Sequence, residues 1–249
     1  MKKYWLNLSV LLSCFGAVFN LSAAEHTTAE LRSLKEKIDR AIIKVEQTQR
    51  NLWSYTISRY EDEEGDISSS IEEHSPQLSE PWLLKQINGK TPTKKQIRKF
   101  TKEKQEQSST DKKEEKQGEN IQIPLRKLIN LESLSLVSTD EKQIVMGFNV
   151  YMKKLGKDSI GKLQGKLFYQ KEKQFIEKIT IWNNAEFSPM FTANITDLSL
   201  TFIFLNINGA VLAKQNEMKM KGSFAYFTEI NETSLDNFSD YLFQCDQTE

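Results

Sequence analysis

The chain has 249 residues, of which 38% are hydrophobic and 27% are charged, with 34 basic and 34 acidic side chains. Because these charges balance, the molecule has no overall field that would attract nucleic acid, and we expect no nucleic-acid partner. The length suits one large domain or two small ones.

The first 24 residues have the layout of a secretory signal peptide. A basic start precedes an apolar run over residues 5–19, and the small residues Ser22-Ala23-Ala24 follow. The segment has no acidic residue, and its apolar part is shorter than the ~20 residues that a permanent membrane span needs. We therefore predict cleavage between Ala24 and Glu25, a periplasmic location, and no transmembrane span in the mature chain.

An alternative leader interpretation involves Cys14. Leu11-Leu12-Ser13-Cys14 resembles a bacterial lipobox, whose cysteine is lipidated and becomes the new N-terminus. Leu12 is bulky where a lipobox usually has a small residue, and the apolar run continues past the cysteine to Phe19. A lipoprotein anchored through Cys14 therefore remains the second interpretation.

Cleavage leaves a nearly neutral mature chain with one cysteine. Loss of Lys2 and Lys3 reduces the 34 basic residues to 32 against 34 acidic ones, a formal charge of −2. The remaining Cys245 can form no intramolecular disulfide, so stability must come from the core. Whether Cys245 pairs between chains or stays an idle thiol is open.

An amphipathic helix is predicted over residues 28–50. Apolar residues recur at helical spacing, and charged residues such as Lys35, Glu36 and Asp39 lie between them. Such a stripe can bind a membrane or a partner helix, but it more commonly covers a sheet of its own domain. The apolar positions are Leu31, Leu34, Ile38, Ile42, Val45 and Leu52.

Strand periodicity begins at Trp53. Alternation predicts strands over 53–58, 67–71 and 82–87, the last ending at the turn signal Asn88-Gly89. Thr93 and Gln96 have capping-box spacing and predict a short helix over 93–101. Asp62-Glu63-Glu64 and Glu72-Glu73 are expected to be solvated.

A charged insert follows the short helix at residues 102–122. Eleven of the 20 residues 101–120 are charged and none is aromatic. This composition buries too little apolar surface to offset the entropy of ordering. We expect a solvated extension of the helix followed by a disordered loop, with no assigned role.

The second half is predicted to be an antiparallel meander. Polar turns at 139–142 and 171–174 and the Asn208-Gly209 turn separate its strands. Phe238–Phe243 is expected to be a last edge strand. The other predicted strands are 133–138, 143–151, 161–170, 175–183, 197–206 and 217–229.

One face of this meander is apolar and the other is wet. Leu200 and Phe202 alternate with polar residues on one strand, as Met218 and Met220 do on another. The opposite face carries lysines, including Lys166 and Lys178. The apolar face must be covered by helices or by a ligand.

Catalytic and metal-binding motifs are missing from the sequence. The histidines are His26, beside the cleavage site, and His74, in a polar context. There is no Cys/His cluster with metal spacing, no nucleophile elbow and no phosphate-binding glycine loop. We therefore predict no enzyme, no cofactor, no metal and no catalytic residues.

Residues 82–93 resemble a sequence motif of uncharacterised exported proteobacterial proteins. Their sequence is Trp82-Leu83-Leu84-Lys85-Gln86-Ile87-Asn88-Gly89-Lys90-Thr91-Pro92-Thr93. In element order over about 25–243, the mature chain also resembles the LolA/LolB lipoprotein carriers. That resemblance implies a curved half-barrel whose concave apolar face holds acyl chains beneath covering helices. No carrier motif matches residue by residue, and the insert at 102–122 departs from the carrier plan.

The sequence thus predicts one α+β domain over 25–249. We expect a strongly curved antiparallel sheet, covered on its apolar face by the long N-terminal helix and the short second helix. The leading functional hypothesis is a periplasmic binding protein or chaperone that shelters an acyl chain or a lipoprotein. The alternatives are an envelope interaction protein with a self-filled core and, third, an unrecognised hydrolase. The predicted ligand-lining residues are Met146, Leu200, Phe202, Met218, Met220 and Phe224.

Overall fold

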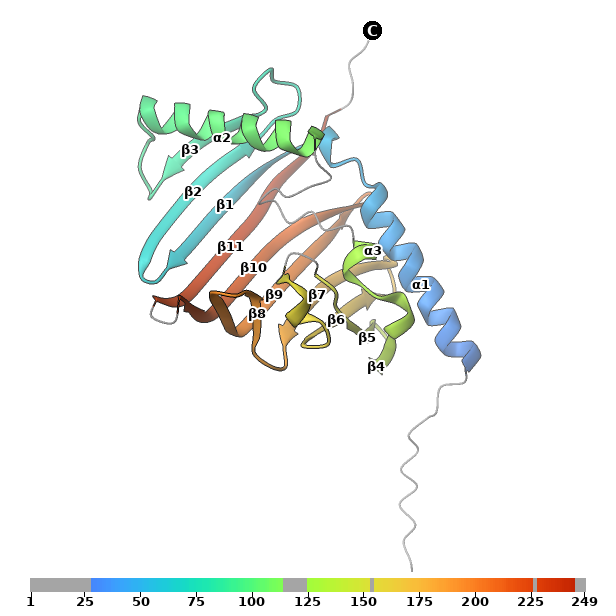
Figure 1. Ribbon diagram of the computed structural model, residues 1–249. Helices are drawn as coiled ribbons and strands as arrows, with labels where there is room; N and C mark the ends of the chain where they lie inside the picture. The colour runs from blue at the N-terminus through green and yellow to red at the C-terminus, as the bar shows by residue number, and fades with distance from the viewer. Residues whose placement is uncertain (1–27, 114–124, 153–154, 226–227, 245–249) are drawn as a thin grey trace, which may run out of the picture.

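An open sheet of eleven strands forms the body of the protein, with helices against one of its faces (Figure 1). The computed structural model describes residues 28–113, 125–152, 155–225 and 228–244. The predicted signal peptide, both cysteines and residues 114–122 of the insert lie outside these ranges. The predicted class, an α+β fold with a curved antiparallel sheet, is confirmed.

The helices and strands have the following bounds. The helices are α1 (Thr28–Gln47), α2 (Lys94–Lys113) and α3 (Leu125–Leu128), with short 3-10 turns that include η4 (Lys157–Ser159). The strands are β1 (Trp53–Glu63), β2 (Asp66–His74), β3 (Trp82–Ile87), β4 (Ser135–Thr139), β5 (Gln143–Asn149), β6 (Leu163–Gln170), β7 (Phe175–Asn183), β8 (Phe187–Met190), β9 (Ala193–Ile207), β10 (Ala210–Phe224) and β11 (Thr228–Phe243).

The strand order joins the two ends of the described chain. It runs β3-β2-β1-β11-β10-β9-β7-β6-β5-β4, and β8 pairs with β9. Phe238–Phe243 was predicted to be an edge strand, and this prediction is wrong. These residues form the end of β11, which lies between β1 and β10. The predicted strand 217–229 is also wrong, because β10 ends at Phe224 and β11 begins at Thr228. No turn signal marks this aromatic stretch.

Both Asn-Gly turns are confirmed. Asn88 and Gly89 have φ values of 49° and 71°, and Asn208 and Gly209 have values of 50° and 95°. Positive φ at both central residues fits a type I′ hairpin turn, which Asn and Gly adopt with little strain. The first turn lies between β3 and α2, and the second connects β9 to β10.

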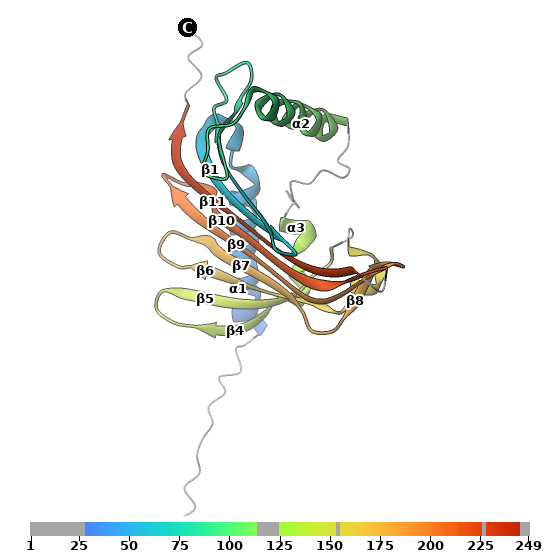
Figure 2. The same ribbon diagram turned by 90° about the vertical axis from the view of Figure 1, so that its left-hand side faces the viewer.

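The sheet bends around α2 and α3, so the face toward these helices is concave (Figure 2). Burial alternates along β6, where Leu163 and Leu167 are buried while Gln164 is exposed. On the convex face, Lys178 lies 4.9 Å from the centre of the Phe168 ring and Lys166 lies 5.6 Å from that of Trp182. The predicted division into an apolar and a wet face therefore holds across this half of the sheet.

Helix α1 seals the apolar half of the concave face. Its buried residues Ile38, Ala41, Ile42 and Val45 belong to one core cluster with side chains of β5, β6, β7, β9 and β10. Helix α3 adds Leu125 and Leu128 to the same cluster. The predicted packing of the first helix against the sheet is thus observed.

Helix α2 covers the other end of the concave face and continues past the predicted 93–101 helix into the insert, where an extension of the helix was expected. A reciprocal capping box starts it, in which Thr93 N donates to Gln96 Oε1 at 2.8 Å and Gln96 N donates to Thr93 Oγ1 at 3.3 Å. The helix then continues through the charged residues to Lys113. Among the described residues, no helix is long and apolar enough to cross a membrane.

Gly165 provides a test of the concave packing. It pairs across strands with the buried Phe148, and a Cβ at Gly165 would lie 2.3 Å from the Phe148 ring. We expect Gly165→Ala to lower the free energy of unfolding by about 1–3 kcal/mol through overpacking, measured by urea titration. Gly147→Ala is the control, because its added Cβ would meet side chains no closer than 3.3 Å. Equal losses in both variants would contradict this packing.

Candidate functional site

The candidate site is the concave face between α1 and α2, and the strand register places all six predicted lining residues on that face. Met146 and Leu200 are 0% and 3% exposed and belong to the core beneath α1. Phe202, Met218 and Met220 are partly buried against that core. Phe224 is 45% exposed at the end of β10.

The concave face changes from apolar to charged along single cross-strand rows. One row runs Leu136, Met146, Leu167, Ile179, Phe202, Asn216, Asp236, Arg59. Strands in a sheet are about 4.8 Å apart, so about 14 Å separates the Phe202 position from that of Arg59. The neighbouring row repeats the change, from Leu200 through Met218 and Ser234 to Glu61. The boundary follows the last apolar residue, which is Phe202 on β9 in the first row and Met218 on β10 in the second.

At this boundary lies a group that we call the apolar strip: Phe202, Met218, Met220 and Ile230. All four are partly buried side chains that pack on the edge of the core. Met218 and Met220 on β10 are paired across strands with Leu200 and Leu198 on β9, which are buried. The strip therefore presents large, adaptable side chains beside a sealed core.

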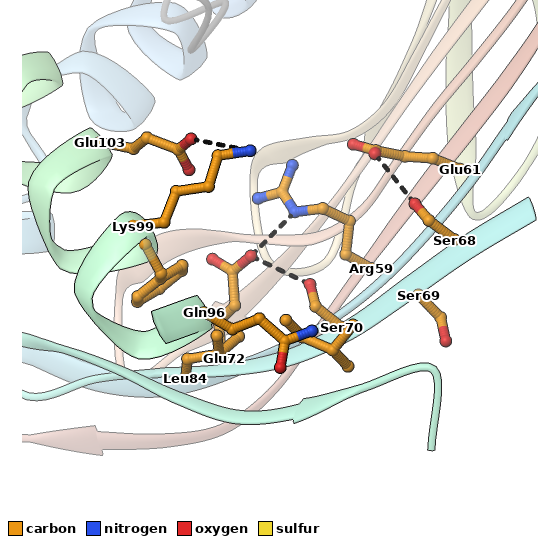
Figure 3. Close-up of a pocket in the computed structure, with 12 residues that line it drawn as sticks. Arg59, Glu61, Ser68, Ser69, Ser70, Glu72, Leu84, Gln96, Lys99 and Glu103 are labelled. Carbon is orange, nitrogen blue, oxygen red and sulfur yellow. Dashed lines mark hydrogen bonds and ion pairs between the residues drawn. The ribbon is translucent and has the colours of Figure 1, made fainter. Parts of the chain in front are cut away.

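Beyond the strip, a polar pocket of about 300 Å³ lies between α2 and the β1–β3 hairpins (Figure 3). The sheet contributes Arg59, Glu61, Ser70 and Glu72, whose interactions are drawn in Figure 3. Helix α2 contributes three polar side chains and one aromatic ring to the same pocket: Gln96, Lys99, Phe100 and Glu103.

Glu72 is the centre of the charge network behind this pocket. It is 5% exposed, and its Oε1 lies 3.3 Å from Arg59 Nε and accepts a hydrogen bond from Ser70 Oγ at 3.1 Å. Its Oε2 lies 2.9 Å from Lys104 Nζ on α2. Arg59 also reaches Asp236 on β11, with an Nη1–Oδ2 distance of 3.1 Å. Four elements are thus tied together through one carboxylate and one guanidinium.

The prediction that Glu72 is solvated is wrong. Residues 66, 68, 70, 72 and 74 of β2 face α2, so Ile67 points to the convex side and is 62% exposed. The sequence favours the opposite orientation, because isoleucine is the apolar residue of this strand. Arg59, Lys104 and Asp236 were also missed, since their partners come from sequence positions that local patterns do not connect.

An aromatic cluster adjoins the charge network. The Tyr55 and His74 rings stack with centroids 4.9 Å apart, and Lys104 Nζ lies 4.4 Å from the centre of the Trp82 ring. Trp82 and Leu84 belong to the motif 82–93, which forms β3, the Asn-Gly turn and the N-cap of α2. This motif therefore supports the start of α2.

Burial favours the neutral forms of His74 and Tyr55 in this cluster. Burial lowers the pKa of His74, although the Trp53 carbonyl at 3.1 Å from Nδ1 opposes the shift and Lys104 adds to it. Burial also raises the pKa of Tyr55 to about 12, against the effect of Arg50. Neutral His74 stacked in this way is placed for packing. The described residues contain no group of three potential metal ligands close enough to hold an ion.

Comparison with known proteins gives little. No family model matches the chain, and no curated protein matches it. A crystal structure of a DUF1329 family protein from Desulfovibrio piger aligns with a TM-score of 0.35 and 7% identity, over 88% of this chain and 94% of that one. This likeness is too distant to support an argument, and it leaves the resemblance to LolA/LolB carriers untested.

Removing Glu72 should destabilise the fold. Glu72→Ala leaves Arg59 and Lys104 close together with little solvent, and loss of one partner from a buried pair typically costs about 3 kcal/mol. The neighbouring Glu73→Ala breaks only the exposed pair with Lys85 and should cost less than about 1 kcal/mol. Urea unfolding of both variants measures the two losses in the free energy of unfolding. Similar losses would show that the Glu72 network does not hold α2.

Asp236 gives a pH-dependent expectation. Burial raises the pKa of its carboxyl above the ordinary value of 3.8, with Arg59 opposing and Glu72 adding to the rise. The folded state therefore binds this proton more tightly than the unfolded chain, and stability falls as pH rises through the shifted range. The stability of Asp236→Asn relative to wild type should therefore be higher at pH 7 than below pH ~3.8, whatever the loss of the Arg59 contact costs at both pH values.

Urea unfolding at both pH values measures this difference. The exposed Asp197→Asn is the control, and its effect should not change with pH in the same way. A relative stability of Asp236→Asn that is as high in acid as at neutral pH would contradict the assignment.

Proposed function

We propose that this protein is an exported, non-enzymatic carrier or chaperone that shelters an acyl chain, free or attached to a lipoprotein, on the apolar strip. The leader sequence supports export to the periplasm. The partly buried Phe202, Met218, Met220 and Ile230 beside a sealed core carry the proposal. Such flexible apolar side chains adapt to a disordered chain.

The graded concave face suits an amphiphile. An acyl chain on β9 and β10 would lie with its polar end toward β11 and β1. There the cross-strand row that begins with Leu200 and Met218 continues with Ser234 and Glu61. The acyl chain would then contact apolar side chains and its polar end would contact polar side chains, so neither part is buried in an unfavourable environment. The six predicted lining residues then divide into core support and contact surface.

A second candidate is an envelope interaction protein whose concavity is filled by its own side chains. The near-complete burial of Met146 and Leu200 beneath α1 favours it for the inner part of the face. The third possibility, a hydrolase, has less support. His74 is stacked and bonded to a backbone carbonyl, so it is poorly placed as a base.

Two neighbouring residues of β9 discriminate between these functions. Phe202→Asp should leave the protein folded and weaken binding of a fluorescent fatty acid at least about tenfold, since a charge disfavours an acyl chain on the strip. Leu200→Asp is the matched control and should unfold the protein, because it buries an unpaired charge in the core. Circular dichroism and fluorescence titration measure both.

Native mass spectrometry of protein from its own envelope completes the test. A co-purifying lipid that Phe202→Asp loses would support the carrier. If the wild-type protein carries no lipid and binds no fluorescent fatty acid, the interaction protein is favoured. Unfolding of Phe202→Asp would mean that the strip is ordinary core.

A further inference from the structure

Two hairpin ends expose large apolar side chains at one end of the sheet. Phe191, in the β8–β9 turn, is 90% exposed, and Met190 beside it is 58% exposed. Phe224, at the end of β10, is 45% exposed. We call these three residues the apolar tip. In Figure 2 this end of the sheet, marked by β8, projects at the edge of the molecule.

The strand register holds the three residues together. Met190 pairs with Ala193, which pairs in turn with Phe224, so one cross-strand row joins β8, β9 and β10. Ala225 N also donates to Thr192 O at 2.7 Å and fixes the two chain reversals side by side. The tip is therefore a surface held together by strand pairing and by this hydrogen bond.

The residues of the tip itself and their chain neighbours carry no charge, although Asp158 accepts a hydrogen bond from Ser188 N and Glu186 accepts one from Asn194 Nδ2. Residues 187–194 and 222–225 together contain no Asp, Glu, Lys or Arg, although 27% of the whole chain is charged. At that average, about three of these twelve residues would carry a charge. Exposed turns are usually rich in polar residues. An uncharged turn with an almost fully exposed phenylalanine therefore favours a contact with something other than water.

The apolar tip continues into the apolar strip along β10. On the concave face Met218 and Met220 are followed by Gly222 and Phe224. Gly222 is paired with Ile195 and Ile230, so the apolar surface is not interrupted at the glycine. A Cβ at Gly222 would lie 2.1 Å from Asn194 O, so no side chain can stand there. An apolar path thus runs from the core edge to the outermost point of the sheet.

We propose that the apolar tip inserts into the surface of a lipid bilayer. Phenylalanine and methionine favour the acyl boundary, and an uncharged turn can enter it without burying an unpaired charge. A protein partner is a poorer fit, because stable interfaces bury about 800 Å² per partner and the exposed parts of these three side chains supply roughly 400 Å². The bilayer would then meet the end of the path that leads to the strip.

The experiment measures binding of the exported full chain to neutral phosphatidylcholine vesicles by flotation. Phe191→Ser should lower the vesicle partition coefficient about tenfold, and Phe191→Ser with Phe224→Ser should lower it further, because apolar burial supplies the binding energy. Raising the salt concentration to 1 M should not weaken wild-type binding. Intact mass of each preparation ensures that all variants share one N-terminus.

Ile67→Ser is the matched control, since Ile67 is 62% exposed on the convex side of β2, outside the tip. It should leave vesicle binding unchanged. The proposal is overturned if the wild-type chain does not float with vesicles, or if Ile67→Ser reduces binding as much as Phe191→Ser. A dimer that Phe191→Ser converts to a monomer, with unaltered vesicle binding, also overturns it and makes the tip a contact between copies.

Membrane docking can fail separately from the carrier function. Tip variants should still bind the fluorescent fatty acid, whereas Phe202→Asp should still float with vesicles. If the wild-type chain floats with vesicles but does not bind the fluorescent fatty acid, the carrier is refuted and docking still stands. Loss of vesicle binding alone in the Phe202→Asp variant would place the membrane contact on the strip and refute the tip.

Discussion

The pairing of β1 with β11 is the contact on which the site depends. Ten residue pairs join a strand near the start of the described chain to the strand at its end. Without them, β1–β3 with α2 would be separate from the larger meander. With them, Arg59 stands next to Asp236, and the charged hairpins extend the concave face that the apolar strands began. The long sequence separation makes this contact entropically expensive to form, so the ordered ladder must offset that loss.

The charge network then determines how α2 can lie. A lysine on the helix reaches a carboxylate on β2, which shares an arginine with β11. Each of these groups is only partly solvated, so their mutual arrangement must be retained once the helix is docked. The apolar contacts of Phe100 and Leu84 supply burial, while the ions fix the position along the strands. The polar half of the concave face is therefore an organised surface.

Much of the fold follows from local sequence patterns. Alternation predicted the apolar face of β5, β6, β7, β9 and β10 but not the short strand β8, and Asn-Gly and the Thr93–Gln96 spacing located turns and a helix start. The strand partner of β1 could not be predicted, because no local pattern encodes a contact between residues 59 and 236. The orientation of β2 was hidden for a related reason: its isoleucines face outward, since a helix with ionic contacts covers the other side. The turn after Phe224 lacks glycine or asparagine, so it resembles strand.

Curvature explains why the concave face has three parts rather than one. Register shifts interrupt the pairing of β1 with β11, β2 with β3, β4 with β5, β6 with β7 and β9 with β10, and such irregularities bend and twist strands. One straight helix can follow only part of a strongly bent sheet. Helix α1 seals one end and α2 covers the other, so the side chains between them stay partly exposed. The same concave face can therefore serve packing in one part and contact solvent or ligand in the next.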